Sequence, residues 1–404
     1  MSKKKAKLLV LTSTYPRWLG DYEPGFVHEL SKRLTQEFEV TVLCPRSKGA
    51  SSLEFIDDVR IIRFRYAPSP FESLIHNGGI IGNIKANPLK ATLLPLLILG
   101  QFFAFLKIII AWKPDVIHAH WLIPQGLMAA MFSVLGCKVP FLVTSHGADL
   151  YSLRSSIFQK LKRFVARRAN ACTVVSRAML EEARRIDIAC QEITVEPMGV
   201  DLSGRFVNDP AVARSNNEIL FVGRLVEKKG LKYLLDAMPG ILSNHPAAKL
   251  IVVGFGPEEA NLKDQASNLS LDNSVEFVGA VEQHELPQYY QRACVFVAPF
   301  VRAEGGDQEG LGLVLVEALG CGCKVVVSKL PAVEDVIEHT SSVTVVPPGD
   351  PRAITSAVSQ MLKPVECSGD RTSEWQSSEQ LKLCFDWNHV ATRYATKLKR
   401  ISQR

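Results

Sequence analysis

The stretch that decides the fold is Glu309-Gly-Leu-Gly-Leu-Val-Leu-Val-Glu317, which continues into Ala318-Leu-Gly-Cys-Gly322. It predicts the start of a helix that has an acid at each end of two turns, with small and apolar residues between them. The β-branched run 323–328 that follows predicts a strand. A loop, a helix N-terminus and a strand in this order build an anion site, because free backbone N–H groups and the positive end of the helix dipole face the ligand.

The spacing of the two acids suggests the size of that ligand. Residues eight apart on a helix are separated by about 12 Å along its axis. This is roughly the length of a pyrophosphate with part of a sugar. We therefore expect Glu309 and Glu317 to reach the two ends of a nucleotide-sugar whose phosphates lie over the helix N-terminus.

Strand patterns alternate with helical patterns along the whole chain, which predicts parallel, doubly wound α/β sheets with ligands beyond the carboxyl ends of the strands. The polar segment around 201–217 interrupts the alternation, so we expect two domains with a cleft between them. The expected parts are a first domain (1–203), a linker (204–217), a second domain (218–374) and a helical C-terminal segment (375–404) that packs back on the first domain. The expected strands are 7–12, 38–43, 59–64, 115–120, 140–144, 171–175, 192–195, 218–222, 249–253, 275–278, 294–298, 323–328 and 342–346.

The composition and net charge limit the class of protein. With 404 residues, 47% hydrophobic and 22% charged, the chain has a normal globular balance and is too long for one ordinary core. Its net charge of +6 is mildly basic, which fits contact with phosphates or an anionic membrane surface rather than a nucleic-acid binder. The nine scattered cysteines predict buried free thiols in a reducing compartment, and no signal peptide is visible. Cys321 and Cys323 are expected to be structural.

One apolar stretch, 91–111, is long enough to span a membrane as a helix. Pro95, Gly100, Gln101 and Lys107 favour a buried or surface-docked helix over a true span. A helix that lies in the membrane interface is the alternative.

Cations follow the first strand of the second half, in Phe221-Val-Gly-Arg-Leu-Val-Glu-Lys-Lys-Gly230. Arg224 and Lys229 would lie at the ligand edge of the sheet, where two fixed cations could neutralise a pyrophosphate leaving group. The alternative is a solvated loop. Gly254-Phe-Gly256 at the next strand end is either a phosphate turn or ordinary turn chemistry.

Histidines are candidate site residues in the first half of the chain. His146 follows the strand 140–144, where it could hydrogen-bond a substrate hydroxyl, although a lone histidine is often structural. His118 and His120 point to one face of a strand. They lack further metal ligands, so a structural role is favoured. Asp57 and Asp58 are expected in a hairpin, facing solvent.

These motifs together resemble the retaining GT-B glycosyltransferases of family 4. The resemblance covers nearly the whole chain and rests on the paired-glutamate motif and on further segments in the family's order. The segments are 14–17 (Thr-Tyr-Pro-Arg), 114–121 (Pro-Asp-Val-Ile-His-Ala-His-Trp), 145–147 (Ser-His-Gly), 197–201 (Pro-Met-Gly-Val-Asp), 221–224 (Phe-Val-Gly-Arg) with Lys229, and 298–299 (Ala-Pro) before an acid-rich loop. It implies two Rossmann-like domains that face a central cleft, the second binding the donor and the first the acceptor.

The resemblance also implies roles for single residues. Arg224 and Lys229 would hold the diphosphate, Glu317 the ribose hydroxyls and Glu309 the donor sugar, while His146 would hydrogen-bond that sugar near the reacting centre. Backbone N–H groups would come from Gly310, Leu311, Gly312, Leu313 and Val314. Gly20 lies in a loop that approaches the donor phosphate or the acceptor; its sequence, Leu19-Gly-Asp-Tyr22, departs from the family's usual Gly-Gly pair, which weakens the expectation for this loop.

The implied activity is metal-independent hexosyl transfer, without a cofactor, from a UDP- or GDP-sugar to a glycan or lipid-linked glycan in surface polysaccharide biosynthesis. The expected location is the cytoplasm, with peripheral contact at the inner face of the cell membrane. One alternative is a soluble sugar or sugar-phosphate acceptor, and another is a non-catalytic nucleotide-binding protein of the same fold. The sequence does not choose between UDP and GDP.

Overall fold

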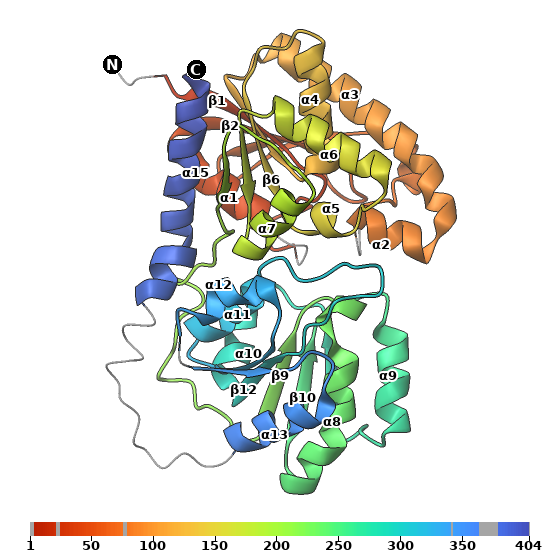
Figure 1. The fold of residues 1–404 in the computed structure, drawn as a ribbon, viewed down its shortest axis with the longest axis vertical. Helices are drawn as coiled ribbons and strands as arrows, with labels where there is room; N and C mark the ends of the chain where they lie inside the picture. Colours follow the sequence, from red (N-terminus) through yellow and green to blue (C-terminus); the bar gives the residue numbers. More distant parts are fainter. Residues whose placement is uncertain (1–3, 22–24, 76–78, 341, 363–378, 404) are drawn as a thin grey trace. The chain divides into compact units, whose positions relative to one another are not determined.

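The computed structural model describes residues 4–21, 25–75, 79–340, 342–362 and 379–403 (Figure 1). Its contacts divide the chain into two units. The first unit contains residues 1–198 and 390–404, and the second contains residues 199–389.

An eight-stranded sheet forms the centre of the first unit, in the order β3-β4-β2-β1-β5-β6-β7-β8. Every strand pairing is parallel except that of the edge strand β3 with β4. The β5 and β6 strands are buried along their whole length, as expected for strands covered on both faces. The bounds are β1 (Ala6–Leu11), β2 (Phe38–Pro45), β3 (Leu53–Ile56), β4 (Val59–Phe64), β5 (Val116–His120), β6 (Phe141–Ser145), β7 (Ala171–Val174) and β8 (Ile193–Val195).

Helices flank this sheet on both sides (Figure 1). The C-terminal helix packs on it through Tyr394, whose hydroxyl donates to the Glu196 carbonyl at 3.0 Å, and through Arg393, whose Nε donates to the Glu196 carboxylate at 3.0 Å. The helices are α1 (Phe26–Leu34), α2 (Gly79–Ala86), α3 (Leu94–Ala111), α4 (Leu127–Val134), α5 (Ala148–Tyr151), α6 (Ser156–Arg168), α7 (Arg177–Arg185) and α15 (Trp387–Ser402), with short helical turns η1 (Ser69–Phe71), η2 (Pro88–Leu93) and η3 (Leu122–Gly126).

The second unit has a sheet of six parallel strands in the order β11-β10-β9-β12-β13-β14. The strands are β9 (Glu218–Val222), β10 (Lys249–Val253), β11 (Val275–Gly279), β12 (Val295–Ala298), β13 (Lys324–Ser328) and β14 (Val343–Val346). The helices are α8 (Leu231–Asn244), α9 (Glu259–Asn268), α10 (Leu286–Arg292), α11 (Leu313–Gly320), α12 (Glu334–Ile337) and α13 (Pro351–Met361), with the turns η4 (Glu227–Lys229) and η5 (Pro331–Val333).

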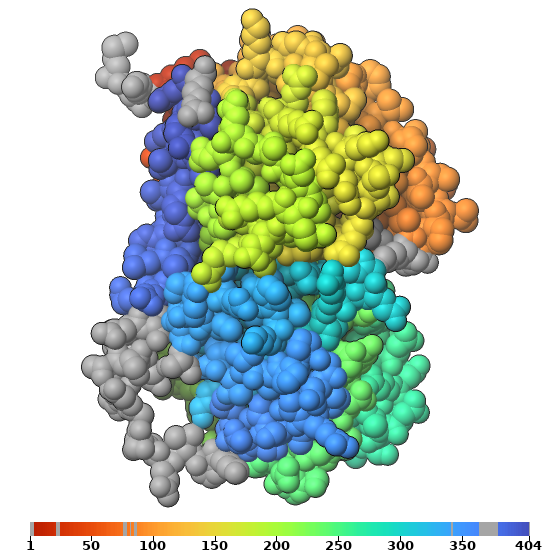
Figure 2. Space-filling model, in the orientation of Figure 1, coloured from red at the N-terminus to blue at the C-terminus, as the bar shows by residue number. Residues whose placement is uncertain are grey.

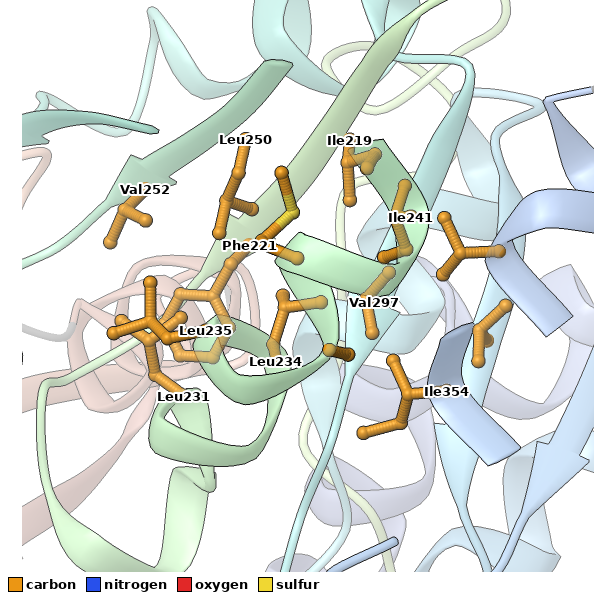
Figure 3. Close-up of a cluster of buried hydrophobic side chains, with 14 of the residues drawn as sticks. Ile219, Phe221, Leu231, Leu234, Leu235, Ile241, Leu250, Val252, Val297 and Ile354 are labelled. Carbon is orange, nitrogen blue, oxygen red and sulfur yellow. The ribbon is translucent and has the colours of Figure 1, made fainter. Parts of the chain in front are cut away.

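The core of the second unit lies between α8 and the sheet (Figure 3). Leu234, Leu235 and Ile241 of α8 are fully buried against Ile219 of β9 and Leu250 of β10. Each such side chain contributes about 1.5–3 kcal/mol by leaving water. This packing fixes the turn between β9 and α8, which carries the candidate cations.

The expected fold, α/β with two parallel-sheet domains, is confirmed. The β4, β9 and β10 strands have the expected bounds, and Cys321 and Cys323 are buried free thiols. The edge strand β3 was not expected, because its alternating residues are largely exposed. The expected hairpin at Asp57 exists, but its carboxylate does not simply face solvent: it pairs with Lys32 at 2.9 Å.

Candidate active site

The helix of the opening stretch begins later than its sequence suggests. We predicted a helix over both glutamates, but α11 begins at Leu313 and its N-cap, Gly312, has a φ of +84°. This left-handed conformation cannot continue a right-handed helix. Glu309 therefore lies in the loop before α11, and the 12 Å spacing, which assumed a continuous helix, does not apply.

Glu309 forms a largely buried ion pair with Lys229. The Lys229 Nζ atom donates to Glu309 Oε2 at 2.7 Å, and the two side chains are 13% and 15% exposed. Burial alone would raise the pKa of Glu309, but the charges of Lys229 and Lys228 and the hydrogen bond lower it to about 2. Glu309 is therefore ionised at neutral pH.

The turn that carries Lys229 depends on a glycine. Gly230 has a φ of +69°, and a Cβ atom there would lie 1.8 Å from the Pro299 carbonyl oxygen. Only glycine allows α8 to begin this close to the end of β12. Arg224 lies half-buried two residues after β9, on the same turn.

The η4 turn and the loop 301–309 are held together by further contacts that our reading of the sequence missed. Lys228 Nζ donates to Asp307 Oδ1 at 3.2 Å, the Lys228 carbonyl accepts from the Val301 N–H, and the Glu304 N–H donates to Glu227 Oε1 at 2.9 Å. These contacts hold the loop that presents Glu309. The partners are about 80 residues apart in sequence, so no local pattern predicts them.

Glu317 has a different environment, although it lies in the same motif. The hydroxyl of the buried Tyr290 donates to Glu317 Oε2 at 2.8 Å. Burial raises the pKa of Glu317, because this hydrogen bond and the more distant charges of Lys229 and Arg205 compensate for desolvation only in part. No local sequence pattern marks Tyr290, on α10, as part of the site.

Backbone donors are available where α11 begins. In the described part of the chain, the N–H groups of Leu311, Gly312, Leu313 and Val314 form no hydrogen bond, and that of Gly310 makes a 3.3 Å contact to Glu309. Free N–H groups at a helix N-terminus attract anions. The second unit thus places Glu309, Lys229 and these donors around one loop.

His146 belongs to the first unit, directly after β6. His120 Nδ1 lies 2.9 Å from His146 Nε2, and the Phe26 and Trp121 rings lie 4.9 and 5.0 Å from the His146 ring. Burial lowers the pKa of His146 to about 3, so its imidazole is neutral at physiological pH. His118 and His120 do point to one face of β5, with ring centroids 4.1 Å apart.

The loop that contains Gly20 is held by its neighbour. Asp21 is buried and accepts from the backbone N–H and the guanidinium of Arg17, at 2.8 Å for each of N and Nε. Gly20 itself is exposed, with a φ of +85°. Across the described residues, no group of three or more His, Cys, Asp or Glu side chains is arranged to hold a metal ion.

Known proteins resemble both units. The family model described as Glycosyltransferase Family 4 matches residues 26–203, and that described as Glycosyl transferases group 1 matches residues 206–367. Among solved structures, sucrose-phosphate synthase from Thermosynechococcus elongatus has a TM-score of 0.76 at 21% identity, covering 98% of this chain and 99% of its own. Anabaena HepE in complex with UDP-glucose has a TM-score of 0.71 at 18% identity, with coverage of 98% and 99%.

Three relatives by sequence show the range of identity and coverage. An uncharacterised glycosyltransferase of Methanocaldococcus jannaschii is 29% identical, over 62% of this chain and 66% of its own. The amylovoran biosynthesis glycosyltransferase AmsK of Erwinia amylovora is 29% identical over 52% of each. A GDP-mannose-dependent phosphatidylinositol monomannoside mannosyltransferase of Mycolicibacterium smegmatis is 26% identical over 88% and 89%. The chain spans 52–66% of the length of the first three curated relatives it matches.

The fold therefore places the protein in a class: α/β proteins with two parallel-sheet domains and the GT-B architecture of glycosyltransferases. The two family models match most of the chain between them, one in each half. Residues 206–367 match the group 1 glycosyltransferases and residues 26–203 match Glycosyltransferase Family 4, so the chain is similar to glycosyltransferases along most of its length.

Proposed function

We propose that this protein is a retaining hexosyltransferase. It moves a hexose from a UDP- or GDP-sugar to a glycan or lipid-linked glycan acceptor in surface polysaccharide biosynthesis. The matches to two glycosyltransferase family models support the reaction class, and relatives such as AmsK support the pathway class by their names. HepE, a relative by fold, binds UDP-glucose, which supports a nucleotide-sugar donor.

The observation that carries the proposal is the Lys229–Glu309 ion pair beside the free N–H groups of α11. An ammonium group has three donors, so Lys229 can keep Glu309 and still bind a phosphate oxygen. Glu309 stays ionised beside it and can accept from sugar hydroxyls. A cation, a carboxylate and backbone donors around one loop match a sugar joined to a diphosphate.

The reaction follows from these groups. The bond between the sugar C1 and the diphosphate oxygen breaks, and Lys229, Arg224 and the N-terminus of α11 stabilise the charge on the leaving phosphate. The acceptor hydroxyl forms the new bond to C1 on the same face, and its proton passes to the leaving phosphate. Glu309 orients the sugar and Glu317 binds the ribose hydroxyls. No covalent intermediate, metal or cofactor is required in this scheme.

The first unit suggests where the acceptor is presented. Residues 73–180 carry twelve Lys and Arg side chains against two acids, although the whole chain has a net charge of only +6. The same segment contains η2 and α3, which are together long and apolar enough to cross a membrane, with 22% of this apolar window buried. An apolar helix in a basic segment suits the surface of an anionic bilayer.

The exposed side of α3 fits this role (orange in Figure 2). Phe103 and Ile110 are each 63% exposed, and Leu99 is 52% exposed. Lys107, on the same helix, is also exposed. We therefore propose that the protein is cytoplasmic and meets the inner face of the membrane through α3.

The proposal is tested by Glu309→Ala and Lys229→Ala proteins that remain folded. Both should transfer sugar far more slowly than the wild type, by at least a hundredfold, since each removes a charged contact at the reacting centre. Transfer at the wild-type rate in both would refute the assignment. Thermal stabilisation by a panel of UDP- and GDP-sugars would identify the donor, because a ligand that binds only the folded state raises the melting temperature.

Membrane contact is tested by flotation with vesicles that contain an anionic lipid. The wild type should float, and a Phe103→Ser, Ile110→Ser variant should not. A matched control, Leu53→Ser with Phe55→Ser, replaces two similarly exposed apolar residues on β3 and should float normally. If the wild type stays in solution at low salt, the soluble acceptor becomes the better hypothesis.

A further inference from the structure

Three imidazoles form a chain at the carboxyl ends of β5 and β6. The ring centroids of His118 and His120 are 4.1 Å apart, and those of His120 and His146 are 5.2 Å apart and nearly parallel. His118 and His120 are fully buried, whereas His146 is partly exposed. Their contacts determine where each ring carries its proton.

The buried nitrogens decide the tautomer of His120. Its Nε2 atom is buried and has no hydrogen-bond partner among the described residues. A buried N–H group without an acceptor is rarer in proteins than an acceptor without a donor. The proton of the neutral His120 ring therefore belongs on Nδ1, which lies 2.9 Å from His146 Nε2.

The tautomer of His120 determines the tautomer of His146. If His120 Nδ1–H donates to His146 Nε2, that nitrogen must be the acceptor and the single proton of the neutral His146 ring lies on Nδ1. In the described part of the chain, no hydrogen bond engages His146 Nδ1, and this atom is not among the buried atoms without a partner. It is therefore available to a ligand.

His120 is itself held in place. The same reasoning puts the proton of His118 on Nε2, which donates to Thr144 Oγ1 at 2.8 Å, because its Nδ1 is buried without a partner. Thr144 in turn lies 2.6 Å from Thr173 Oγ1. The His118 ring packs between His120 and Tyr394, whose ring centroid is 5.4 Å away. His120 thus packs against a ring that is itself held by a hydrogen bond to Thr144.

The backbone near His146 is strained in a way that suits a functional site. Trp121 follows β5 with a φ of +72°, which is rare for a bulky residue and costs roughly 1–3 kcal/mol. Its N–H donates to the Thr144 carbonyl at 2.7 Å. This conformation places the indole ring 5.0 Å from the His146 ring, where it limits rotation of the imidazole.

We propose that His120 is a positioning residue that fixes His146 as its Nδ1–H tautomer, so that His146 offers a hydrogen-bond donor to an oxygen of the bound sugar or acceptor. The tautomer follows from the first unit alone. Its use in transfer rests on the proposed function. A donor here would orient the reacting sugar through a lone pair of that oxygen, whereas the other tautomer could only accept a hydrogen bond from a hydroxyl and would orient the same oxygen differently.

The tautomer is measured by a two-bond ¹H–¹⁵N correlation spectrum of the full-length ¹⁵N-labelled protein at neutral pH, with a His146→Asn variant to assign the signal. His146 should be protonated on Nδ1 in the wild type. His120→Asn should preserve this state, because the asparagine amide N–H can replace the Nδ1–H group. His120→Leu removes the donor, and His146 should become a mixture of tautomers.

Kinetics separate positioning from a purely structural role. His120→Leu should lower kcat by roughly tenfold or more, the equivalent of one well-placed hydrogen bond, with the donor KM little changed. His120→Asn should restore kcat to within a few-fold of the wild type. A merely structural role would instead lower the melting temperature of both variants and leave the His146 tautomer unchanged.

Two results would overturn the proposal. One is an Nε2–H tautomer of His146 in the wild type, which needs no variant to fold. The other is an unaltered His146 signal in His120→Leu. Failure of the proposed function is a separate outcome: if His146→Asn transfers sugar at the wild-type rate, His146 has no role in transfer, while the spectrum still decides the tautomer.

Discussion

Replacing Lys229 by methionine should destabilise the protein, because it leaves a buried carboxylate without its partner. The pKa of Glu309 is about 2 in the folded protein, against an ordinary value of 4.5. This difference corresponds to about 3 kcal/mol of folding free energy at neutral pH. It also agrees with the roughly 3–5 kcal/mol lost when one partner of a buried ion pair is removed.

The pH dependence gives this prediction its sign. Because folding lowers the pKa of Glu309, its contribution is complete above about pH 4.5 and is lost as the pH falls towards 2. The difference in free energy of unfolding between the wild type and Lys229→Met should therefore be largest at neutral pH and shrink towards pH 2. Urea unfolding followed by circular dichroism, repeated across this range, measures the difference.

Two controls sharpen the experiment. In the double variant, Lys229→Met with Glu309→Gln, no charge is left unpaired, so most of the lost stability should return. Lys263→Met breaks a pair with Glu259 of similar length, 2.8 Å, whose side chains are 51% and 36% exposed, and should cost less than about 1 kcal/mol. A Lys229→Met protein as stable as the wild type at pH 7, or a difference independent of pH, would refute the reasoning.

Three further predictions concern the same framework. Gly230→Ala should prevent folding of the second unit or shift its melting temperature strongly, since the added Cβ would overlap a backbone carbonyl; Gly279→Ala, also at positive φ but with open space around it, should cost only about 1–2 kcal/mol. Tyr290→Phe removes the hydrogen bond to Glu317, so calorimetry should show weaker binding of UDP or GDP, whichever is the donor nucleotide, with kcat little changed. Burial lowers the pKa of His118 to about 3, so as the pH falls below about 6.5 the unfolded chain takes up a proton at His118 while the folded protein does not, and the free energy of unfolding decreases. The urea midpoint should therefore fall less between about pH 7.5 and 5 in His118→Leu than in the wild type.

Much of the fold could be predicted from the sequence because parallel strands buried on both faces are marked by local apolar runs. Thus 218–222 and 249–253 were identified to the residue. The β3 strand was missed because it lies at an edge, where Leu53 and Phe55 are exposed and alternation carries little signal. The helix start at Leu313 was missed because apolar spacing continues across Gly312, and only the backbone conformation shows the break.

The contacts around the candidate site could be predicted only in part, because they depend on partners far apart in sequence. The turn with Arg224 and Lys229 was predicted at the ligand edge because it follows the carboxyl end of a strand, and the Glu309 stretch was predicted as an anion site because it precedes a helix N-terminus. The pairing of Lys228 with Asp307 joins them across 79 residues. Two lysines alone are typical of a solvated loop; the strand and Gly223-Arg224 before them favoured a ligand site, but nothing in the sequence showed that Lys228 has an acidic partner.

The two glutamates of the opening motif show why spacing alone does not define a role. The chain offers the same side chain twice, eight residues apart, but the fold gives Glu309 an ammonium partner and Glu317 a phenol. Lys229 lowers the pKa of Glu309, so this carboxylate stays ionised near the expected phosphate. At Glu317 burial is the largest effect and raises the pKa. A carboxylate that holds a neutral hydroxyl suits a ribose, and one that is ionised beside a cation suits the end where charge develops. The proposed assignment of Glu309 to the sugar and Glu317 to the nucleoside, which the resemblance implies, thus gains support from their partners, Lys229 and Tyr290, which the motif does not contain.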